Sequence, residues 1–325
     1  MALYDLPPDQ LAHYTTSTAA PGDLDQFWAS TLQQARALAS PPVLAAAKTG
    51  LTLVETFDVR FSGFGGAPVR AWLHRPTAID APLPAVVRYL GYGAGRGLAH
   101  EVDVWTLAGY ATLVVDTRGQ GAGPTPGDTS DPVGSGPAQP GFMTRGILDP
   151  SDYYYRRVYT DAALAVDAVR QLPGIDPHRV ALTGGSQGGG ITLAVSALVP
   201  DVAAVMPDVP FLCDFRRATA VTDHDPYAEI VRYLRAHRDA PTMDQVFRTL
   251  AYFDCAVLVR HSTAPAVFSV ALMDPICPPS TVYAAYNAYA GAKDIRVYPF
   301  NEHEGGQGHQ QAEQLRWLEQ LPHGS

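Results

Sequence analysis

The sequence predicts an α/β protein with a mostly parallel central sheet and helices on both of its faces. Short apolar runs bounded by Gly, Pro or Asp recur along the 325 residues, as expected of strands that are buried on both faces. Stretches with apolar residues at helical spacing lie between these runs, which indicates parallel strands joined by right-handed crossovers. One run leads directly into Gly184-x-Ser186-x-Gly188, and an Ala- and Val-rich segment follows that turn.

Residues 1–50 are predicted to be a helical arm that packs on the core. Six apolar residues of this arm share one helical face, and they are Leu24, Phe27, Trp28, Leu32, Ala35 and Leu38. Residues 51–325 are then predicted to form a single domain. A chain of this length can bury one large core, and its turn-rich stretches are typical of surface loops.

The domain is predicted to begin with two antiparallel strands, Val54 to Phe61 and Val69 to His74, which a Gly- and Pro-rich turn joins. Further strands are expected where apolar runs recur, namely just before Ser186 and at 85–90, 111–116, 203–206, 266–272 and 295–300. Helices are expected where apolar residues recur at helical spacing, at 160–172, 190–199, 279–290 and 309–321.

Two stretches depart from this alternation of strands and helices. The Gly-, Pro- and Asp-rich stretch 120–155 is far longer than an ordinary connection, and its aromatic residues indicate an ordered loop. The stretch 210–262 contains helix-like segments at 226–238 and 242–250. We therefore predict a partly helical insertion that lies over the site.

Composition excludes several classes of protein. The net charge is −9 and basic clusters are few, which argues against nucleic-acid binding. The first thirty residues have no basic segment followed by an apolar one, and no run of eighteen apolar residues occurs, so we expect neither a secretory signal nor a membrane span. Three cysteines, Cys213, Cys255 and Cys277, are expected to be buried reduced thiols of a cytoplasmic protein.

The Gly184-x-Ser186-x-Gly188 turn is typical of a nucleophile elbow. A serine hydroxyl is a poor nucleophile at neutral pH, so it needs a neighbouring base and backbone N–H donors. Small residues at 184 and 188 allow a helix to start very close to the strand. The same pattern also occurs in ordinary strand-to-helix turns and in anion-binding helix starts, so its partners must decide the interpretation.

If Ser186 is a nucleophile on this scaffold, its partners should follow in the order acid, then histidine, each just after a strand. Asp274 directly follows the strand ending at Met273, although a turn or helix-cap aspartate would stand there too. His303 follows the last strand in a Gly-rich loop and is the expected general base, with His309 as the alternative. A metal site formed by His303, Glu304 and His309 is disfavoured, because the spacing is not His-Glu-x-x-His.

Two backbone N–H groups are expected to stabilise the developing oxyanion, and they belong to Gln187 and Tyr92. Tyr92 lies in the glycine-rich loop 90–97, which follows a predicted strand. The same loop matches Gly-x-Gly-x-x-Gly, so a dinucleotide site with Asp116 as its acidic residue is kept as an alternative.

Three motifs carry a resemblance to a known family: Arg118-Gly119-Gln120, Gly184-Gly185-Ser186-Gln187-Gly188 and His303-Glu304. With these motifs the chain resembles the family 7 carbohydrate esterases, which are acetyl xylan esterases and cephalosporin C deacetylases. The likeness covers essentially the whole chain. It extends to the stretches 141–149, 208–213 and 277–283.

The resemblance implies an α/β-hydrolase fold with a triad of Ser186, Asp274 and His303, and oxyanion donors at Tyr92 and Gln187. It also implies no metal or organic cofactor, a cytoplasmic setting and a ring-shaped homohexamer. The chain departs from many relatives in having Ala94 where they have a second consecutive glycine after the tyrosine. That change bears on the fit of the loop around the acyl group.

The expected function is that of a serine esterase that removes acetyl groups from small acetylated carbohydrates and from cephalosporin C-like acetate esters. The rivals are a broader short-chain carboxylesterase, a thioesterase or a peptidase, and a non-catalytic binding or scaffold protein. We expect the Arg118 guanidinium to tie neighbouring loops through bidentate bonds rather than to touch substrate. The residues expected to support the site are Arg118, Gln120, Gly184, Gly188 and Glu304.

Overall fold

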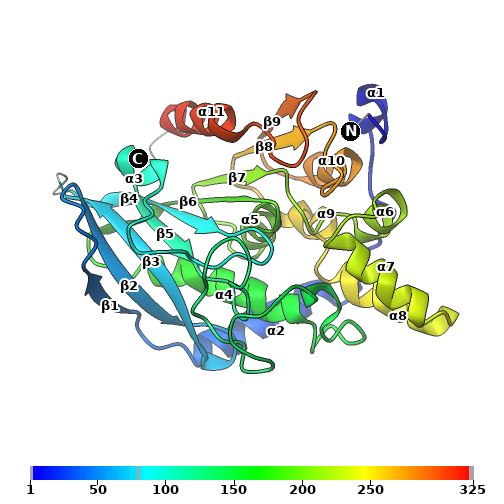
Figure 1. Cartoon of the computed structure of the whole chain (residues 1–325), viewed down its shortest axis with the longest axis horizontal. Helices are drawn as coiled ribbons and strands as arrows, with labels where there is room; N and C mark the ends of the chain where they lie inside the picture. Colours follow the sequence, from blue (N-terminus) through cyan, green and yellow to red (C-terminus); the bar gives the residue numbers. More distant parts are fainter. Residues whose placement is uncertain (1–2, 78, 80, 322–325) are drawn as a thin grey trace.

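The computed structural model describes residues 3–77, 79 and 81–321, so the predicted arm and domain are described within these bounds, and residues 1, 2, 78, 80 and 322–325 lie outside them. The described chain forms a nine-stranded sheet in the order β1-β2-β3-β5-β4-β6-β7-β8-β9 (Figure 1). Its strands are β1 (Val43–Ala47), β2 (Val54–Ser62), β3 (Pro68–Pro76), β4 (Leu83–Tyr89), β5 (Ala111–Val115), β6 (Ile175–Gly185), β7 (Ala204–Asp208), β8 (Ala266–Ala271) and β9 (Lys293–Tyr298).

The sheet is mostly parallel, which confirms the predicted fold class. The neighbouring strands from β5 through β4 and β6 to β9 pair in parallel, whereas β1, β2 and β3 pair antiparallel with one another and β3 pairs antiparallel with β5. Parallel strands end at a common edge, so the loops that follow β4, β6, β8 and β9 converge there. Each of the proposed catalytic residues lies in or beside one of these loops.

Helices cover both faces of the sheet because side chains of the central strands alternate between two apolar layers. Val86, Ala181 and Val267 pack with α3 (Val104–Leu107) and α11 (Gln307–Gln320) on one face. Their neighbours Val87 and Leu182 pack on the other face. That second face is covered by α2 (Leu24–Ala37), α4 (Tyr154–Val169), α5 (Gln187–Leu198) and α10 (Pro279–Ala288).

The arm contains a short helix, α1 (Pro8–Leu11), then α2 and the edge strand β1. On α2 the buried apolar residues are Leu24, Trp28, Leu32 and Ala35, so most of the predicted apolar face packs on the core. Leu38 is an exception, because α2 ends at Ala37 and the Leu38 side chain is exposed. The sequence analysis did not predict β1, which extends the antiparallel part of the sheet.

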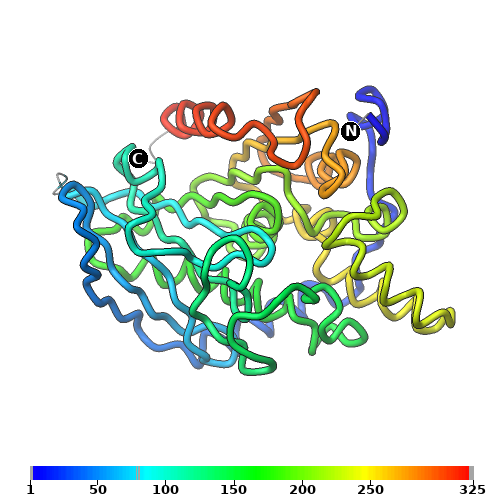
Figure 2. The backbone as a smooth tube through the Cα atoms, in the orientation of Figure 1, coloured from blue at the N-terminus to red at the C-terminus, as the bar shows by residue number. Residues whose placement is uncertain are grey.

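The two irregular stretches differ in detail from the expectation. The long loop carries a buried 3-10 turn at Phe142–Thr144, and α4 begins at Tyr154, six residues before the predicted start. The aromatic residues that indicated an ordered loop are therefore partly helical. Residues 210–262 form α6 (Phe215–Val221), α7 (Tyr227–Ala236), α8 (Ala240–Ala251) and α9 (Cys255–Leu258), and Figure 2 shows the yellow segment of α7 and α8 projecting from one end of the molecule.

Two further expectations about the chain can be compared with the structure. The three cysteines are buried and unpaired. Within the part of the chain that the structure describes, the helices are too short or too polar for any of them to cross a bilayer.

Candidate active site

Ser186 lies on the turn between β6 and α5. Its φ of 57° and ψ of −120° are dihedral angles that non-glycine residues seldom adopt, and such strain is typical of functional sites. Its amide N–H donates to the carbonyl of Asp208 over 2.9 Å, and its carbonyl accepts from the amide of Phe211 over 2.9 Å. These bonds hold the Ser186 side chain at the carboxyl end of the sheet.

The glycines on either side of Ser186 are required by close packing. A Cβ atom at Gly184 would lie 2.5 Å from the backbone carbonyl carbon of Gly188. A Cβ atom at Gly188 would lie 2.3 Å from the carbonyl oxygen of Tyr89 on β4. Both positions therefore exclude a side chain, since β4, β6 and α5 approach one another here by their backbones.

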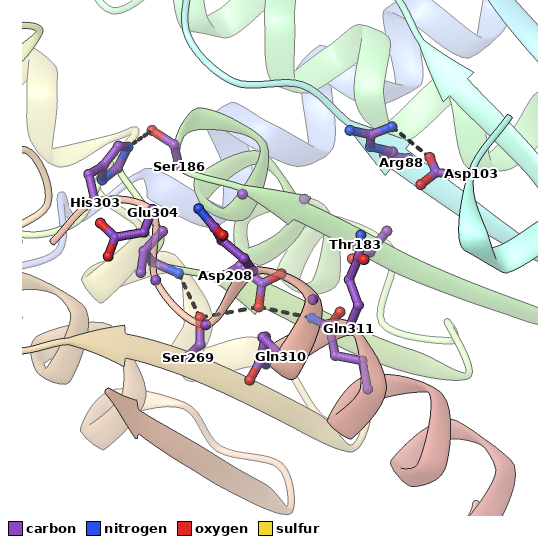
Figure 3. Close-up of a pocket in the computed structure, with 18 of the residues that line it drawn as sticks. Arg88, Asp103, Thr183, Ser186, Asp208, Ser269, His303, Glu304, Gln310 and Gln311 are labelled. Atoms are coloured by element: carbon purple, nitrogen blue, oxygen red, sulfur yellow. Dashed lines mark hydrogen bonds and ion pairs between the residues drawn. The ribbon is translucent and has the colours of Figure 1, made fainter. Parts of the chain in front are cut away.

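Ser186, His303 and Asp274 lie within hydrogen-bonding distance in a continuous series. The Ser186 Oγ is 3.0 Å from His303 Nε2, and His303 Nδ1 is 2.8 Å from Asp274 Oδ2 (Figure 3 shows the Ser186–His303 pair). Asp274 is fully buried, and its other carboxylate oxygen accepts from the amides of Ile276 and Cys277 over 2.8 and 2.9 Å. The carboxylate is thus fixed by its own loop and aimed at the imidazole.

The loop that carries His303 is held by Glu304. This exposed carboxylate accepts from Asn301 Nδ2 over 2.9 Å and from the amide of Glu302 over 3.1 Å, and these bonds lower the pKa of Glu304. His309, the alternative base, is exposed at the start of α11 and takes no part in the series.

The residues weighed as metal ligands are not the ones that the structure brings together. In the described chain the group of three potential ligand atoms within 4.8 Å of one another belongs to Asp274, Cys277 and His303, without Glu304 or His309. Cys277 was not foreseen at this place. Burial raises the pKa of its thiol, so the neutral thiol is the form that lies beside Asp274 and His303.

The loop with Tyr92 is fastened to the turn at Ser186 by two glutamines. Gln120 Oε1 accepts from the amide of Gly93 over 2.7 Å, and Gln120 Nε2 donates to Gln187 Oε1 over 2.9 Å. Gln187 Nε2 donates in turn to the carbonyl of Leu90 over 3.2 Å. In the described turns and loops, neither the Tyr92 nor the Gln187 amide N–H donates to a backbone acceptor. An amide that acts as an oxyanion donor must be free of such a bond.

The Tyr92 side chain joins this loop to the two irregular stretches. Its hydroxyl donates to Glu229 Oε1 on α7 over 2.7 Å and accepts from the amide of Phe142 over 2.9 Å. The other Glu229 oxygen accepts from the amide of Met143 over 3.0 Å. Burial raises the pKa of Glu229, although the Tyr92 bond opposes the rise. The sequence analysis missed Glu229, which no motif near Ser186 marks.

The dinucleotide alternative is not supported. The Asp116 carboxylate is engaged inside its own loop cluster, where it accepts from the amides of Arg96 and Asp128 over 3.1 and 2.6 Å. The glycine-rich loop does not open directly into a helix, since α3 begins only at Val104. A dinucleotide-binding turn requires an acidic residue that is free to bind the ribose and a glycine-rich loop that leads directly into a helix.

Arg118 is buried and forms a bidentate pair with Asp161 on α4. Its Nε and Nη2 lie 2.5 and 2.6 Å from the two carboxylate oxygens, and its Nη1 lies 3.6 Å from Asp131. Asp161 also accepts from the amide of Phe64 over 2.8 Å. The guanidinium thus joins the loop after β5 to α4 and, through Asp161, to the β2–β3 turn.

A polar groove of about 390 Å³ opens beside Ser186 and His303, between the sheet and α11 (Figure 3). Asp208, at the end of β7, lines this groove. Its Oδ1 accepts from Gln314 Nε2 over 2.9 Å and from Ser269 Oγ over 3.2 Å. Burial raises the pKa of Asp208 to about 6, although hydrogen bonds from the side chains of Gln314, Ser269 and Gln310 oppose the rise. The groove was not foreseen, because its lining comes from four strands, β4, β6, β7 and β8, and from two helices, α3 and α11, that are far apart in the sequence.

The N-terminal arm contacts the loop that carries Asp274. The Tyr4 hydroxyl donates to the carbonyl of Asp274 over 2.5 Å. The buried Asp5 carboxylate accepts from the amide of Ser280 in the first turn of α10 over 2.7 Å, and from Arg217 Nη2 over 2.8 Å. Asp5 therefore acts as a cap for α10 although it lies far from this helix in the sequence. It holds in place the start of α10, which directly follows the loop that carries Asp274.

The sheet order, the turn at Ser186 and the helices on both faces define the α/β-hydrolase fold. Solved structures with the same fold include acetyl xylan esterase 1 from Thermoanaerobacterium sp. JW/SL YS485, with a TM-score of 0.88 and 32% identity over 97% of this chain and 99% of that one. The acetyl xylan esterase from Paenibacillus sp. R4 matches with a TM-score of 0.88 and 36% identity over 97% of this chain and 100% of that one.

Sequence comparison agrees with the structural comparison. The acetyl xylan esterase family (AXE1) matches residues 1–321, and the chain belongs to this family of carboxylic ester hydrolases. Acetyl esterase Axe7A of Xylanibacter ruminicola is 26% identical over 302 residues, which is 91% of this chain and 66% of that protein. The quorum-quenching protein AidA of Acinetobacter baumannii is 31% identical over 166 residues, or 47% of its length. The chain thus spans about half to two thirds of these two relatives.

Proposed function

We propose that this protein is a serine esterase that removes acetyl groups from small acetylated carbohydrates such as xylo-oligosaccharides. The observation that carries the proposal is the hydrogen-bonded series Ser186–His303–Asp274 at the end of a polar groove. The names of the similar proteins support the choice of acyl group and sugar, since they are an acetyl esterase and two acetyl xylan esterases.

In the proposed reaction, His303 Nε2 takes the Ser186 proton as Oγ attacks the acetyl carbonyl. The amides of Tyr92 and Gln187 donate to the oxyanion of the tetrahedral intermediate. His303 then gives the proton to the departing sugar alkoxide, which leaves an acetyl-enzyme. Water attacks this ester with His303 again as base, and acetate and free Ser186 result. Asp274 keeps the imidazole in the required tautomer and stabilises its charged form. Every group in this scheme comes from the chain itself, so the reaction requires no cofactor.

The rival within the same chemistry is a broader short-chain carboxylesterase, and cephalosporin C is a second proposed substrate. Both share the acetyl-enzyme route with the main proposal, so the acyl chain and the alcohol separate them. A non-catalytic binding or scaffold protein is disfavoured by the presence of a competent nucleophile, base and acid together. Labelling of Ser186 by a fluorophosphonate probe distinguishes that class.

The decisive experiment compares the parent with Ser186→Ala on acetyl, butyryl and octanoyl aryl esters, on an acetylated xylo-oligosaccharide and on cephalosporin C. We expect acetyl turnover that falls with chain length, and a loss of about 10⁴- to 10⁶-fold in kcat for Ser186→Ala. Ser151→Ala, which alters an exposed serine, is the matched control and should stay within twofold. A Ser186→Ala protein within tenfold of the parent would contradict the proposal.

We also propose that the protein is a cytoplasmic homohexamer whose ring limits access to the sites, with a small acetylated substrate as its ligand. This proposal rests on the resemblance of the motifs Arg118-Gly119-Gln120 and His303-Glu304 to those of the family. The mass of the protein in solution tests the hexamer.

A further inference from the structure

We infer that Glu229 is a positioning residue that holds the proposed oxyanion donor at Tyr92 in place. This inference rests on the proposed function and adds a residue from the insertion to the machinery of that site. Glu229 lies on α7, 137 positions away from Tyr92 in the chain, and it is buried, with 7% of its surface exposed. It acts on the reaction through the position of the Tyr92 amide.

The Tyr92 side chain is fixed at its hydroxyl and along its ring. The hydroxyl donates to Glu229 Oε1 over 2.7 Å and accepts from the amides of Phe142 and Gly141 over 2.9 and 3.3 Å. The ring packs edge to face on Phe142 and Phe211, with centroids 5.5 and 6.3 Å apart. A tyrosine side chain has few rotatable bonds, so a fixed ring and hydroxyl leave the Tyr92 backbone and its N–H little freedom to move.

The donors and acceptors around Glu229 are matched to an ionised carboxylate. The Tyr92 oxygen already accepts from two amides, so its single proton goes to Glu229 Oε1, and Oε2 accepts from the amide of Met143 over 3.0 Å. A neutral acid would have to place its own proton in one of these two bonds. The carboxylate therefore receives a charge-assisted hydrogen bond from the Tyr92 hydroxyl, which is stronger than a neutral one.

The loop that carries Tyr92 is held from two sides. Gln120 Oε1 accepts from the amide of Gly93, one residue further along the backbone, over 2.7 Å. Glu229 holds the same part of the loop through the Tyr92 side chain, and it joins α7 to the long loop at Met143. Removal of the Glu229 carboxylate leaves the loop with its Gln120 anchor alone. A donor that shifts by about 1 Å from its working position costs about a hundredfold in rate.

A positioning role of this kind has a kinetic signature that differs from a role in binding the ester. The negative charge on the oxyanion develops in the transition state, so a displaced donor lowers kcat and leaves KM nearly unchanged. Loss of a contact that the bound ester also makes would raise KM instead. The ratio of the two effects therefore distinguishes positioning of the Tyr92 amide from binding of the substrate by the Glu229 side chain.

The test measures kcat and KM for 4-nitrophenyl acetate in the parent, Glu229→Ala, Glu229→Gln, Tyr92→Phe and the double variant of Tyr92→Phe with Glu229→Ala. Rates are divided by the number of sites that a fluorophosphonate probe labels, so unfolded protein does not contribute. We expect kcat to fall about tenfold or more for Glu229→Ala and for Tyr92→Phe, with KM within about threefold of the parent. Glu229→Gln keeps one acceptor oxygen for the Tyr92 hydroxyl and should lose less than Glu229→Ala.

The double variant and a control decide whether the two residues act as one unit. Because both substitutions break the same connection, we expect the double variant to be no slower than the slower single variant. Tyr233→Phe removes a hydroxyl from the same helix, α7, and should stay within about twofold of the parent. Losses that multiply in the double variant, or a raised KM at unchanged kcat, would overturn the inference.

Hydrogen exchange separates this inference from the proposed function. The loop 90–97 contains the hydrogen-bonded amides of Gly93 and Gly95, whose exchange reports how firmly the loop is held. We expect these amides to exchange faster in Glu229→Ala than in the parent, while the amides of β8 exchange at the same rate in both. Unchanged exchange in the loop would overturn the inference, whatever the esterase activity. Faster exchange, with no hydrolysis of any acetate ester by the parent, would uphold the link from Glu229 to the loop and refute the catalytic proposal.

Discussion

At the scale of single residues, Asp208 couples the stability of the fold to pH. Its pKa is about 6 in the folded protein, against about 3.9 for an ordinary aspartate, because the carboxylate is buried without a cation. Between these two values the folded protein holds a proton that the unfolded chain has lost. The contribution of Asp208 to stability therefore falls as pH rises from about 4 to 6 and stays low above that window.

The expected consequence is that Asp208→Asn stabilises the protein at pH 8 more than at pH 4.5, by about 2 kcal/mol, since each pKa unit corresponds to about 1.4 kcal/mol and part of the effect is already present at pH 4.5. Asparagine keeps an oxygen that accepts from Gln314 but cannot ionise. Urea unfolding at the two pH values measures the difference. Asp9→Asn, on an exposed part of the arm, is the control and should show no such pH dependence. An equal effect of Asp208→Asn at both pH values would refute the assignment.

Arg118 is a buried charge that, unlike Asp208, has a partner of opposite charge, Asp161. Arg118→Met leaves Asp161 buried without its cation, and loss of one partner from a buried pair costs about 3–5 kcal/mol. We expect a correspondingly lower free energy of unfolding, measured by urea titration. Because Arg118 does not line the groove, the KM of the folded fraction for aryl acetate should change less than threefold. A large change in KM at normal stability would assign Arg118 to substrate binding.

The residues of the candidate site differ in how readily the sequence reveals them. Ser186, Asp274 and His303 could be chosen because each follows a strand and the chain order limits the options. Asp161 and Glu229 could not, because their partners are far away in sequence and no local pattern marks them. Burial, which sets the pKa of Asp208, is likewise a property of the packed protein and not of any short stretch.

At the scale of elements, the N-terminal arm supports the loop that carries the proposed catalytic acid. Asp5→Ala removes the cap of α10 and the partner of Arg217, and loss of a helix cap alone costs about 1 kcal/mol. We expect a lower melting temperature and a kcat at least threefold lower for aryl acetate, with a smaller change in KM. Asp9→Ala tests whether any acidic residue of the arm has this effect. Full activity of Asp5→Ala would show that the loop holds its shape alone.

The elements themselves were predictable to different degrees. The helices α2, α7 and α8 have apolar residues at a clear helical period, and the β2–β3 pair has turn residues between two β-prone runs. The strand β1 was missed because Val43–Ala47 is rich in alanine and lacks an alternation of apolar and polar side chains. The start of α4 was missed because consecutive tyrosines give no period until their burial is known.

At the scale of the whole molecule, the described surface leaves several large apolar side chains in water. Phe300, after the edge strand β9, is 82% exposed, and Leu53 and Leu107 are each 74% exposed. Light scattering of the purified protein is expected to give a mass near 209 kDa, six times the 34.8 kDa of the chain. A monomer mass at micromolar concentration would refute the hexamer. No pattern in the sequence could locate a contact between subunits, since the exposure of side chains depends on the finished fold.

The hydrogen bond between Asp5 and Ser280 joins positions that are 275 residues apart in the chain. During translation at about 5–20 residues per second, residue 5 waits roughly 15 to 55 s before residue 280 has been made. Until then the arm has no loop to hold, and His303 is made later still. Hydrolysis of an ester by a nascent chain would therefore report that distant segments have met, which makes turnover a late and sensitive signal of complete folding.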